Sequence, residues 1–199
     1  MIWFLLACRP DPGEPNYPEP GSLGTDTDAE FLEGPDPYVD GEERLSIGVF
    51  YEGPSTEFVE VDNVTVHFYI YEASFSVNDD TERAEGYLSD KFTLARDTWW
   101  GGGVHWDTPR DLSAYNSYHL SLLSQDAVEI DLGMKASTEN KLKTSDYGFE
   151  ADGEWHHLVI PLADFGVSLD AVEIPMILVS DTSSTGASFL VDNVYMDVE

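Results

Sequence analysis

The sequence predicts an all-β protein, an antiparallel β-sandwich of the jelly-roll type. Three observations lead to this fold class. Apolar and polar residues alternate in many short runs, as in strands that bury only one face. Clusters of Gly, Pro, Asp, Asn and Ser separate these runs. No stretch has the apolar stripe of an amphipathic helix, and the runs lack the spacing of strand–helix–strand units, so an antiparallel arrangement is expected.

The alternating runs predict about ten strands in chain order. The clearest run lies at 128–135, where Val128, Ile130, Leu132 and Met134 alternate with Glu, Asp, Gly and Lys. The other runs lie at 45–51, 64–70, 88–94, 118–124, 158–162, 172–178 and 189–196. Short helical turns are expected at 112–115 and 162–165.

The segment before these strands has a different composition. Residues 9–42 contain seven prolines and many Asp and Glu residues, and few apolar ones. Proline favours extended backbone and like charges repel, so we expect a semi-stiff, disordered stalk. The sequence thus predicts a stalk at 9–42 and one β-sandwich domain at 43–199.

Residues 1–8 are apolar and end at Cys8, the one cysteine of the chain. Such a run is too short for a membrane-spanning helix, which needs about 20 residues. It is similar to the end of a secretion signal, and Leu5-Leu6-Ala7-Cys8 resembles the lipobox of bacterial lipoproteins. That resemblance implies a secreted or cell-surface lipoprotein, attached to the membrane only through a lipid on Cys8. The alternative is a chance apolar start on a soluble protein.

The charge of the chain narrows the classes of partner. There are 39 acidic side chains against nine Lys and Arg, which gives a formal net charge of −30 at pH 7. Such a chain repels phosphate backbones and anionic lipids, which excludes nucleic acid as a partner. The acidity is explained either by calcium binding or by solubility in a salty medium.

Three segments of the C-terminal half carry a family resemblance. They are an Asp111-Leu112-Ser113-Ala114-Tyr115 turn, a segment at 152–165 that begins Asp-Gly-Glu-Trp and ends Ile-Pro-Leu-Ala-Asp-Phe, and a strand at 189–195 that contains Val-Asp-Asn-Val. Together they resemble galactose-binding-like jelly rolls and are similar to carbohydrate-binding modules of bacterial glucanases. The resemblance implies a polysaccharide or cell-surface glycan as the partner.

The same resemblance implies a structural calcium ion between the beginning and the end of the domain. Glu52 resembles the early acidic ligand and Asp192 the late one. Calcium would then hold the sandwich together in place of disulfides. The alternative is that these carboxylates are hydrogen-bonded within turns.

The segment at 98–107 is the candidate ligand site. Trp99, Trp100 and Trp106 surround a glycine triplet, and flat indole rings suit the apolar face of a pyranose. The glycines would let a ligand or a neighbouring strand approach the backbone. Residues that could bind sugar hydroxyls are Arg96, His105 and Asp107. Trp100 and Trp106 share one strand face and Trp99 and His105 the other, so at least one tryptophan is expected to point inward.

A second aromatic cluster lies at 67–71. As a strand it places His67, Tyr69 and Tyr71 on one face, opposite Phe68 and Ile70. This stripe is either part of the sandwich core or an exposed platform, and packing statistics favour the core.

The sequence contains no nucleophile elbow, zinc-protease helix or phosphate-binding loop, so we expect no enzyme activity. The favoured hypothesis is a non-catalytic, surface-anchored module that binds a polysaccharide by aromatic stacking. The alternative is a structural or adhesive surface lipoprotein that binds a protein partner.

Overall fold

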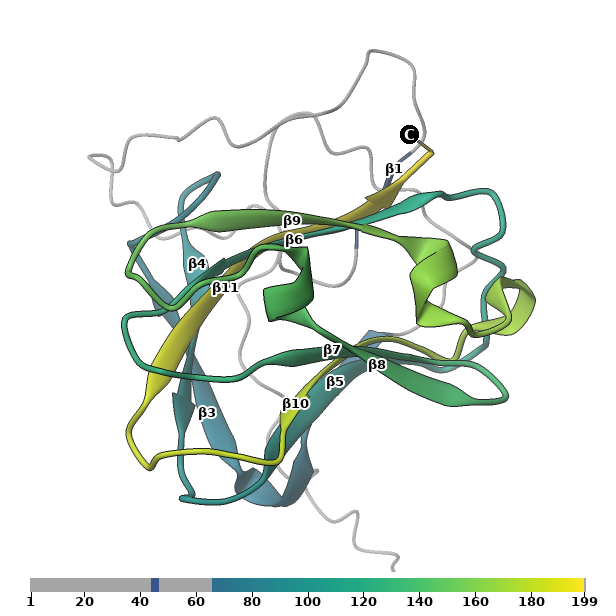
Figure 1. Cartoon of the computed structure of the whole chain (residues 1–199). Helices are drawn as coiled ribbons and strands as arrows, with labels where there is room; N and C mark the ends of the chain where they lie inside the picture. The colour runs from purple at the N-terminus through teal and green to yellow at the C-terminus, as the bar shows by residue number, and fades with distance from the viewer. Residues whose placement is uncertain (1–43, 47–65, 199) are drawn as a thin grey trace, which may run out of the picture.

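The structure is a computed structural model, and it describes residues 44–46 and 66–198 (Figure 1). The described residues form eleven strands and four short 3-10 helices, which confirms the predicted all-β fold. The strands are β1 (Arg44–Ser46), β2 (Val66–Ile70), β3 (Phe75–Asp80), β4 (Ser89–Leu94), β5 (Trp100–Trp106), β6 (Ser117–Leu123), β7 (Asp131–Lys135), β8 (Glu139–Lys143), β9 (His156–Pro161), β10 (Ile174–Ser180) and β11 (Ser188–Asp197). The 3-10 helices are η1 (Tyr71–Ala73), η2 (Thr144–Tyr147), η3 (Leu162–Phe165) and η4 (Leu169–Ala171).

Two antiparallel sheets form the layers of the sandwich. One has the order β3-β4-β11-β6-β9, with β1 also paired to β11, and the other has the order β2-β5-β10-β7-β8. The chain crosses between the sheets repeatedly, for example from β4 to β5 and from β5 to β6. In Figure 1, β9, β6 and β11 lie above the core, and β7, β8, β5 and β10 lie below it.

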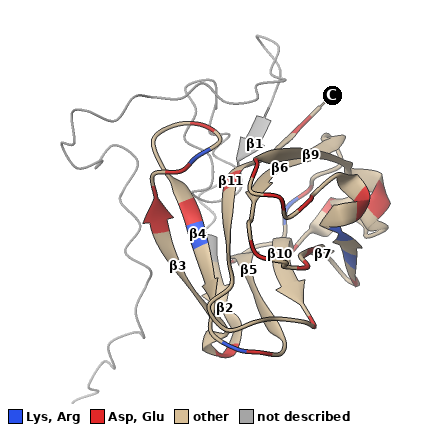
Figure 2. Cartoon of the chain, turned by 60° about the vertical axis from the view of Figure 1, so that its left-hand side comes forward, with Lys and Arg blue, Asp and Glu red and all other residues tan. Residues whose placement is uncertain are grey.

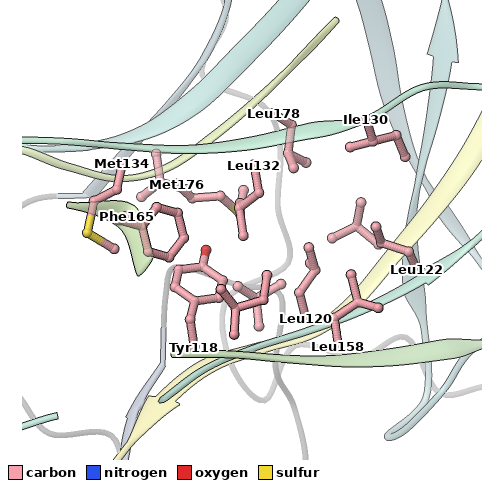
Figure 3. Packing of buried hydrophobic residues seen from close by; sticks show 14 of the residues in the cluster. Tyr118, Leu120, Leu122, Ile130, Leu132, Met134, Leu158, Phe165, Met176 and Leu178 are labelled. Carbon is pink, nitrogen blue, oxygen red and sulfur yellow. The ribbon is translucent and has the colours of Figure 1, made fainter. Parts of the chain in front are cut away.

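The core lies between the two sheets and is closed by apolar side chains from both. Leu120 of β6 and Leu158 of β9 face Leu132 of β7 and Leu178 of β10 (Figure 3). All four are buried, and full burial of each such side chain contributes about 1.5–3 kcal/mol. Since the domain contains no cysteine, this core is its main source of stability.

Two strands were not predicted, β3 and β8. Both lie at an edge of their sheet, and most of their side chains are exposed or half-buried. Their sequences are therefore mostly polar and lack the apolar alternation of a central strand. The predicted helical turn at 162–165 is present as η3. Among the described residues, no helix is long and apolar enough to cross a membrane.

Acidic residues are spread over the loops and strand ends of both sheets (Figure 2).

The runs predicted at 45–51 and 64–70 fall only partly on described residues.

Candidate functional site

β5 carries two of the three predicted tryptophans, and both belong to the core. Trp100 is 0% exposed, and its ring packs 5.9 Å from the ring of Phe75 and 5.1 Å from that of Phe189. Trp106 is 6% exposed, with the guanidinium of Arg110 4.5 Å from its ring centroid. The prediction that Trp100 binds a ligand is therefore wrong, because its ring is packed inside the protein. Trp106 is mostly buried but borders a surface hollow, so its role in binding stays a prediction.

Trp99 lies on the opposite side of the sheet from Trp100, as the strand alternation predicted. It is half-buried and packs against a small apolar cluster of Ile174, Ile177 and Val179 on β10. This cluster is separate from the main core, which takes Met176 and Leu178 from the other face of the same strand. Trp99 thus belongs to the face of the five-stranded sheet that is turned away from the core.

We call this surface the outer face. Its aromatic and apolar residues are Tyr69, Tyr71, Trp99, His105, Ile177 and Val179. It is formed where side chains along β2, β5 and β10 alternate with those that face the core.

The aromatic stripe of β2 lies on the outer face. Phe68 and Ile70 pack against the main core, whereas Tyr69 is 49% exposed. Tyr71, which follows the strand in η1, is half-buried. The favoured interpretation of the stripe as core is wrong, because the other face of β2 supplies the core contacts. The alternative, an exposed platform, agrees with the structure at Tyr69, and the half-buried Tyr71 lies beside it.

His105 contacts both of these tyrosines. Its Nε2 is 2.7 Å from the hydroxyl of Tyr71, and its ring is 4.8 Å from the ring of Tyr69 in an edge-to-face arrangement. Burial, and to a lesser degree the negative charge of Glu139, raises the pKa of the Tyr71 hydroxyl. The hydroxyl therefore keeps its proton at neutral pH, and it can donate a hydrogen bond.

The glycine triplet of β5 makes room for the protein's own rings. A Cβ at Gly101 would lie 3.4 Å from Cδ2 of Tyr71, and one at Gly103 would lie 3.2 Å from its hydroxyl. On the core side, a Cβ at Gly102 would lie 2.6 Å from Cζ of Phe75. The close approach that the glycines predicted is thus made by the neighbouring strands, through the carbonyls of Tyr69 and Met176, and by the rings of Phe75 and Tyr71. The ring of Tyr71 lies over the backbone of β5.

A hollow of ≈ 660 Å³ opens beside these rings. Its lining is made by Tyr69, Ile70, Tyr71, Glu72, His105, Trp106 and Asp107. His105 and Asp107, two of the polar residues predicted to bind a ligand, both line this hollow, and their contact with a ligand stays a prediction.

Arg96 has a different environment from His105 and Asp107. Its guanidinium is 2.8 Å from the carboxylate of Glu72 and also donates to the Glu72 carbonyl. Glu72 and Ala73 both have φ of 51°, a left-handed backbone conformation that is unfavourable for residues other than glycine. Arg96 thus supports this turn beside the hollow and does not line it.

The predicted metal ligands fall in two parts of the chain. Glu52 lies outside the described residues, as does Cys8. Asp192 is 2% exposed; its Oδ2 accepts the backbone N–H groups of Ala84 and Glu85 at 2.8 and 3.0 Å, and its Oδ1 accepts that of Asn193 at 2.7 Å. The carboxylate is thus hydrogen-bonded within the protein, as in the alternative to calcium binding, although Asp192 lies in β11 and not in a turn. No group of three potential metal ligands occurs among residues 44–46 and 66–198. Calcium at Glu52 and Asp192 stays a prediction.

Sequence comparison identifies one family. A family model described as "Carbohydrate binding domain 30" matches residues 47–197. No curated protein sequence matches the chain.

Solved structures share the fold at low sequence identity. The crystal structure of a family 30 carbohydrate-binding module is 14% identical with a TM-score of 0.52, over 66% of this chain and 91% of that one. A family 11 module of the cellulosomal cellulase Lic26A-Cel5E of Clostridium thermocellum is 12% identical with a TM-score of 0.51, over 80% and 95%. A family 11 module from the same organism, in complex with a β-1,3-1,4-mixed-linked tetrasaccharide, is 15% identical with a TM-score of 0.50, over 78% and 94%.

Proposed function

Because the chain belongs to the carbohydrate-binding domain 30 family, we propose that the outer face of its five-stranded sheet binds a neutral polysaccharide without chemically changing it. The chain is a carbohydrate-binding module. The surface it uses and the kind of glycan it takes are the parts proposed here.

The exposed Tyr69, held beside Tyr71 by His105, is the observation that carries the proposal. A pyranose presents an apolar C–H face, which stacks on aromatic rings, and hydroxyls at its rim, which need hydrogen-bond partners. The outer face offers both, since the rings of Tyr69 and Tyr71 lie near the polar groups of His105 and Asp107, and Trp99 adds a further ring on the same face against the cluster of β10. A patch of one exposed and several half-buried aromatic residues on a sheet face is typical of a binding surface.

The charge of the chain favours a neutral glycan. A net charge of −30 would repel a polymer that carries carboxylates or sulfates. Mixed-linked β-1,3-1,4-glucan is a suitable first probe, because it is the type of sugar present in the family 11 complex of similar fold. Stacking involves no ionised group, so we expect binding to persist in moderate salt.

The lipobox-like sequence supports a further part of the proposal. A lipid on Cys8 would attach the chain to a bacterial cell surface, and the Pro-rich segment at 9–42 would hold the module away from the membrane. The module would then bind polysaccharide at the cell surface. Labelling with a radioactive fatty acid, compared between the native chain and Cys8→Ala, tests this anchor.

Affinity electrophoresis in gels that contain mixed-linked β-glucan tests the proposed site. The native protein should be retarded, Tyr69→Ala should lose most of the retardation, and Tyr69→Phe, which keeps the ring, should retain it. Unfolding curves in urea should be similar for all three, because the side chain of Tyr69 is half exposed. If Tyr69→Ala binds as tightly as the native protein, the outer face is not the site. If no polysaccharide in a broad panel binds, the adhesive alternative replaces this proposal.

A further inference from the structure

The strand register aligns one residue from each strand in a row across the outer face. Tyr69 of β2 pairs with Gly103 of β5, Gly103 with Ile177 of β10, Ile177 with Gly133 of β7, and Gly133 with Lys141 of β8. The row runs perpendicular to the strands. It begins at the aromatic edge of the sheet and ends at a lysine.

A second row runs beside the first. Gly101 pairs with Val179, Val179 with Asp131, and Asp131 with Lys143. The two rows therefore bring Asp131, Lys141 and Lys143 together at the end of the outer face opposite Tyr69 and Tyr71. None of these three residues was expected in a binding site from the sequence.

The residues in the middle of the first row are small or apolar. Gly103 and Gly133 stand on either side of Ile177, so Ile177 is the one side chain that the row itself contributes between Tyr69 and Lys141. The ring of Tyr71 lies over Gly103, where a Cβ would be 3.2 Å from its hydroxyl, and extends the aromatic end of the row onto β5. A Cβ at Gly133 would lie 3.1 Å from Cβ of Ile177 and 3.2 Å from Cγ of Lys141. The aliphatic stem of Lys141 thus lies against the glycine, and the apolar surface continues up to its ammonium group.

We call the end of the outer face that carries Asp131, Lys141 and Lys143 the polar end. Its positive and negative charges are balanced. It holds three of the four lysines in the chain, Lys135, Lys141 and Lys143. Lys135 is 2.9 Å from Glu173, Lys141 is 3.2 Å from Glu139, and Lys143 is the register partner of Asp131. Since each lysine has an acidic neighbour, this end offers both donors and acceptors, which suits sugar hydroxyls better than it suits a polyanion.

We propose that an extended neutral polysaccharide lies across the strands from Tyr69 to Lys141, and that Asp131, Lys141 and Lys143 bind the hydroxyls of its far sugar units. This inference rests on the proposed function. Neighbouring strands are about 4.8 Å apart, so the row from β2 to β8 is roughly 19 Å long. The ligand is therefore a linear glycan of several sugar units, and a mono- or disaccharide reaches only one end of the row.

Isothermal titration calorimetry with oligosaccharides of increasing length, cut from mixed-linked β-glucan, tests the inference. For the native protein, affinity should rise with length and level off once the oligosaccharide spans the row. Lys141→Ala and Asp131→Asn should each weaken binding of the longest oligosaccharides about tenfold, as expected for the loss of a hydrogen bond to a charged group. They should leave binding of the shortest ones unchanged.

Lys91→Ala is the matched control, because Lys91 lies on β4 of the other sheet and pairs with Asp80 at 3.4 Å. It should bind every oligosaccharide as the native protein does. Lys143→Ala provides a second test of the polar end if either first variant folds poorly.

The outcomes separate the inference from the proposed function. If neither the polymer nor any oligosaccharide binds the native protein, both the inference and the proposed function are wrong. If long oligosaccharides bind, but all three variants at the polar end bind them as tightly as the native protein, only the inference is wrong. It is also wrong if polygalacturonate binds more tightly than β-glucan and is released by salt, since the lysines would then serve an anionic glycan.

Discussion

The hydroxyl of Tyr71 and Nε2 of His105 are 2.7 Å apart, although the two residues are 34 positions apart in the sequence. The same imidazole also lies against the ring of Tyr69. One side chain of β5 thus fixes the positions of two aromatic rings beside it. A ring that is held before the ligand arrives loses less conformational entropy on binding.

His105→Ala should therefore weaken glycan binding, although the variant still contains both tyrosines. We expect a loss of about fivefold or more, since one hydrogen bond contributes about 1 kcal/mol. Tyr71→Phe keeps the ring and removes the same bond, so it should show a similar loss. Calorimetry with mixed-linked β-glucan and thermal unfolding would measure both effects. Unchanged affinity in both variants would show that His105 does not position the rings.

Trp99 and Trp100 are adjacent in sequence but should respond differently to substitution. Trp100→Ala should lower the free energy of unfolding by about 3–5 kcal/mol, because it empties a fully buried site in the core. Trp99→Ala should cost less stability and reduce glycan binding more. Urea unfolding and affinity electrophoresis of both variants make the comparison. Full binding by a folded Trp99→Ala variant would remove Trp99 from the site.

Asp131→Asn should make the protein more stable at neutral pH and, as inferred above, weaken its binding. Burial raises the pKa of Asp131 above its ordinary value of 3.8, although Lys143 acts in the opposite direction. The folded state then holds this proton more tightly than the unfolded state, so stability is lost as pH rises through the raised pKa. Asn has no charge to bury and avoids this loss.

Thermal unfolding at pH 7 and near pH 3 tests the effect of Asp131→Asn. The variant should melt at a higher temperature than the native protein at pH 7, and the difference should shrink at low pH. Asp152→Asn is the control of opposite sign, because a hydrogen bond from His156 lowers the pKa of Asp152. That carboxylate stabilises the fold above its unfolded pKa, so this control should gain no stability at pH 7. An Asp131→Asn variant that melts below the native protein would contradict the prediction.

Asp192→Asn should destabilise the fold even in the presence of a chelator. Three backbone N–H groups point at the carboxylate, and an amide nitrogen in its place would face some of them as a second donor. The expected loss is about 1–3 kcal/mol, the cost of leaving buried polar groups unsatisfied. Calcium is tested separately. If it binds at Glu52 and Asp192, it should raise the melting temperature, and Glu52→Gln should abolish this effect. Equal melting temperatures in calcium and in chelator would exclude the ion.

Limited proteolysis tests the domain boundary that the sequence predicts. Cleavage should begin within residues 9–42 and leave a resistant fragment that starts near 43, because proteases cut extended, polar segments first. Early cleavage within 120–199 would contradict a single domain at 43–199.

The strand alternation predicted which residues share a face but not which face is buried. Trp100, Val104 and Trp106 were expected on one side of β5 and Trp99 and His105 on the other, and the structure confirms this division. Both sides carry aromatic rings, so hydrophobicity did not distinguish core from surface. Both faces of β2 also carry aromatic rings, and for this reason the interpretation of its aromatic stripe was wrong. Phe68 and Ile70 face inward and Tyr69 faces outward. The tyrosine hydroxyls gave no signal either, because Tyr118 and Tyr195 are fully buried.

The polar end of the outer face could not be found from the sequence. Asp131, Lys141 and Lys143 resemble the wet face of any half-buried strand, and β8 was not predicted at all. Their alignment with Tyr69 depends on the pairings of β10, β7 and β8, which are set by contacts distant in sequence. Local alternation gives the period of a strand, whereas its neighbours and register come from the packed sheet.

The glycine triplet of β5 also limits how the module can evolve. A side chain at Gly102 would lie within 2.6 Å of Phe75 and 2.7 Å of the Tyr69 carbonyl, and one at Gly103 within 2.6 Å of the Met176 carbonyl. Mutation at these positions would be removed by selection for folding before it was tested for binding. Divergence toward another sugar is therefore expected at outer-face positions whose side chains have room, such as Tyr69 of β2, His105 of β5 and Lys141 of β8, while Gly102 and Gly103 stay constant.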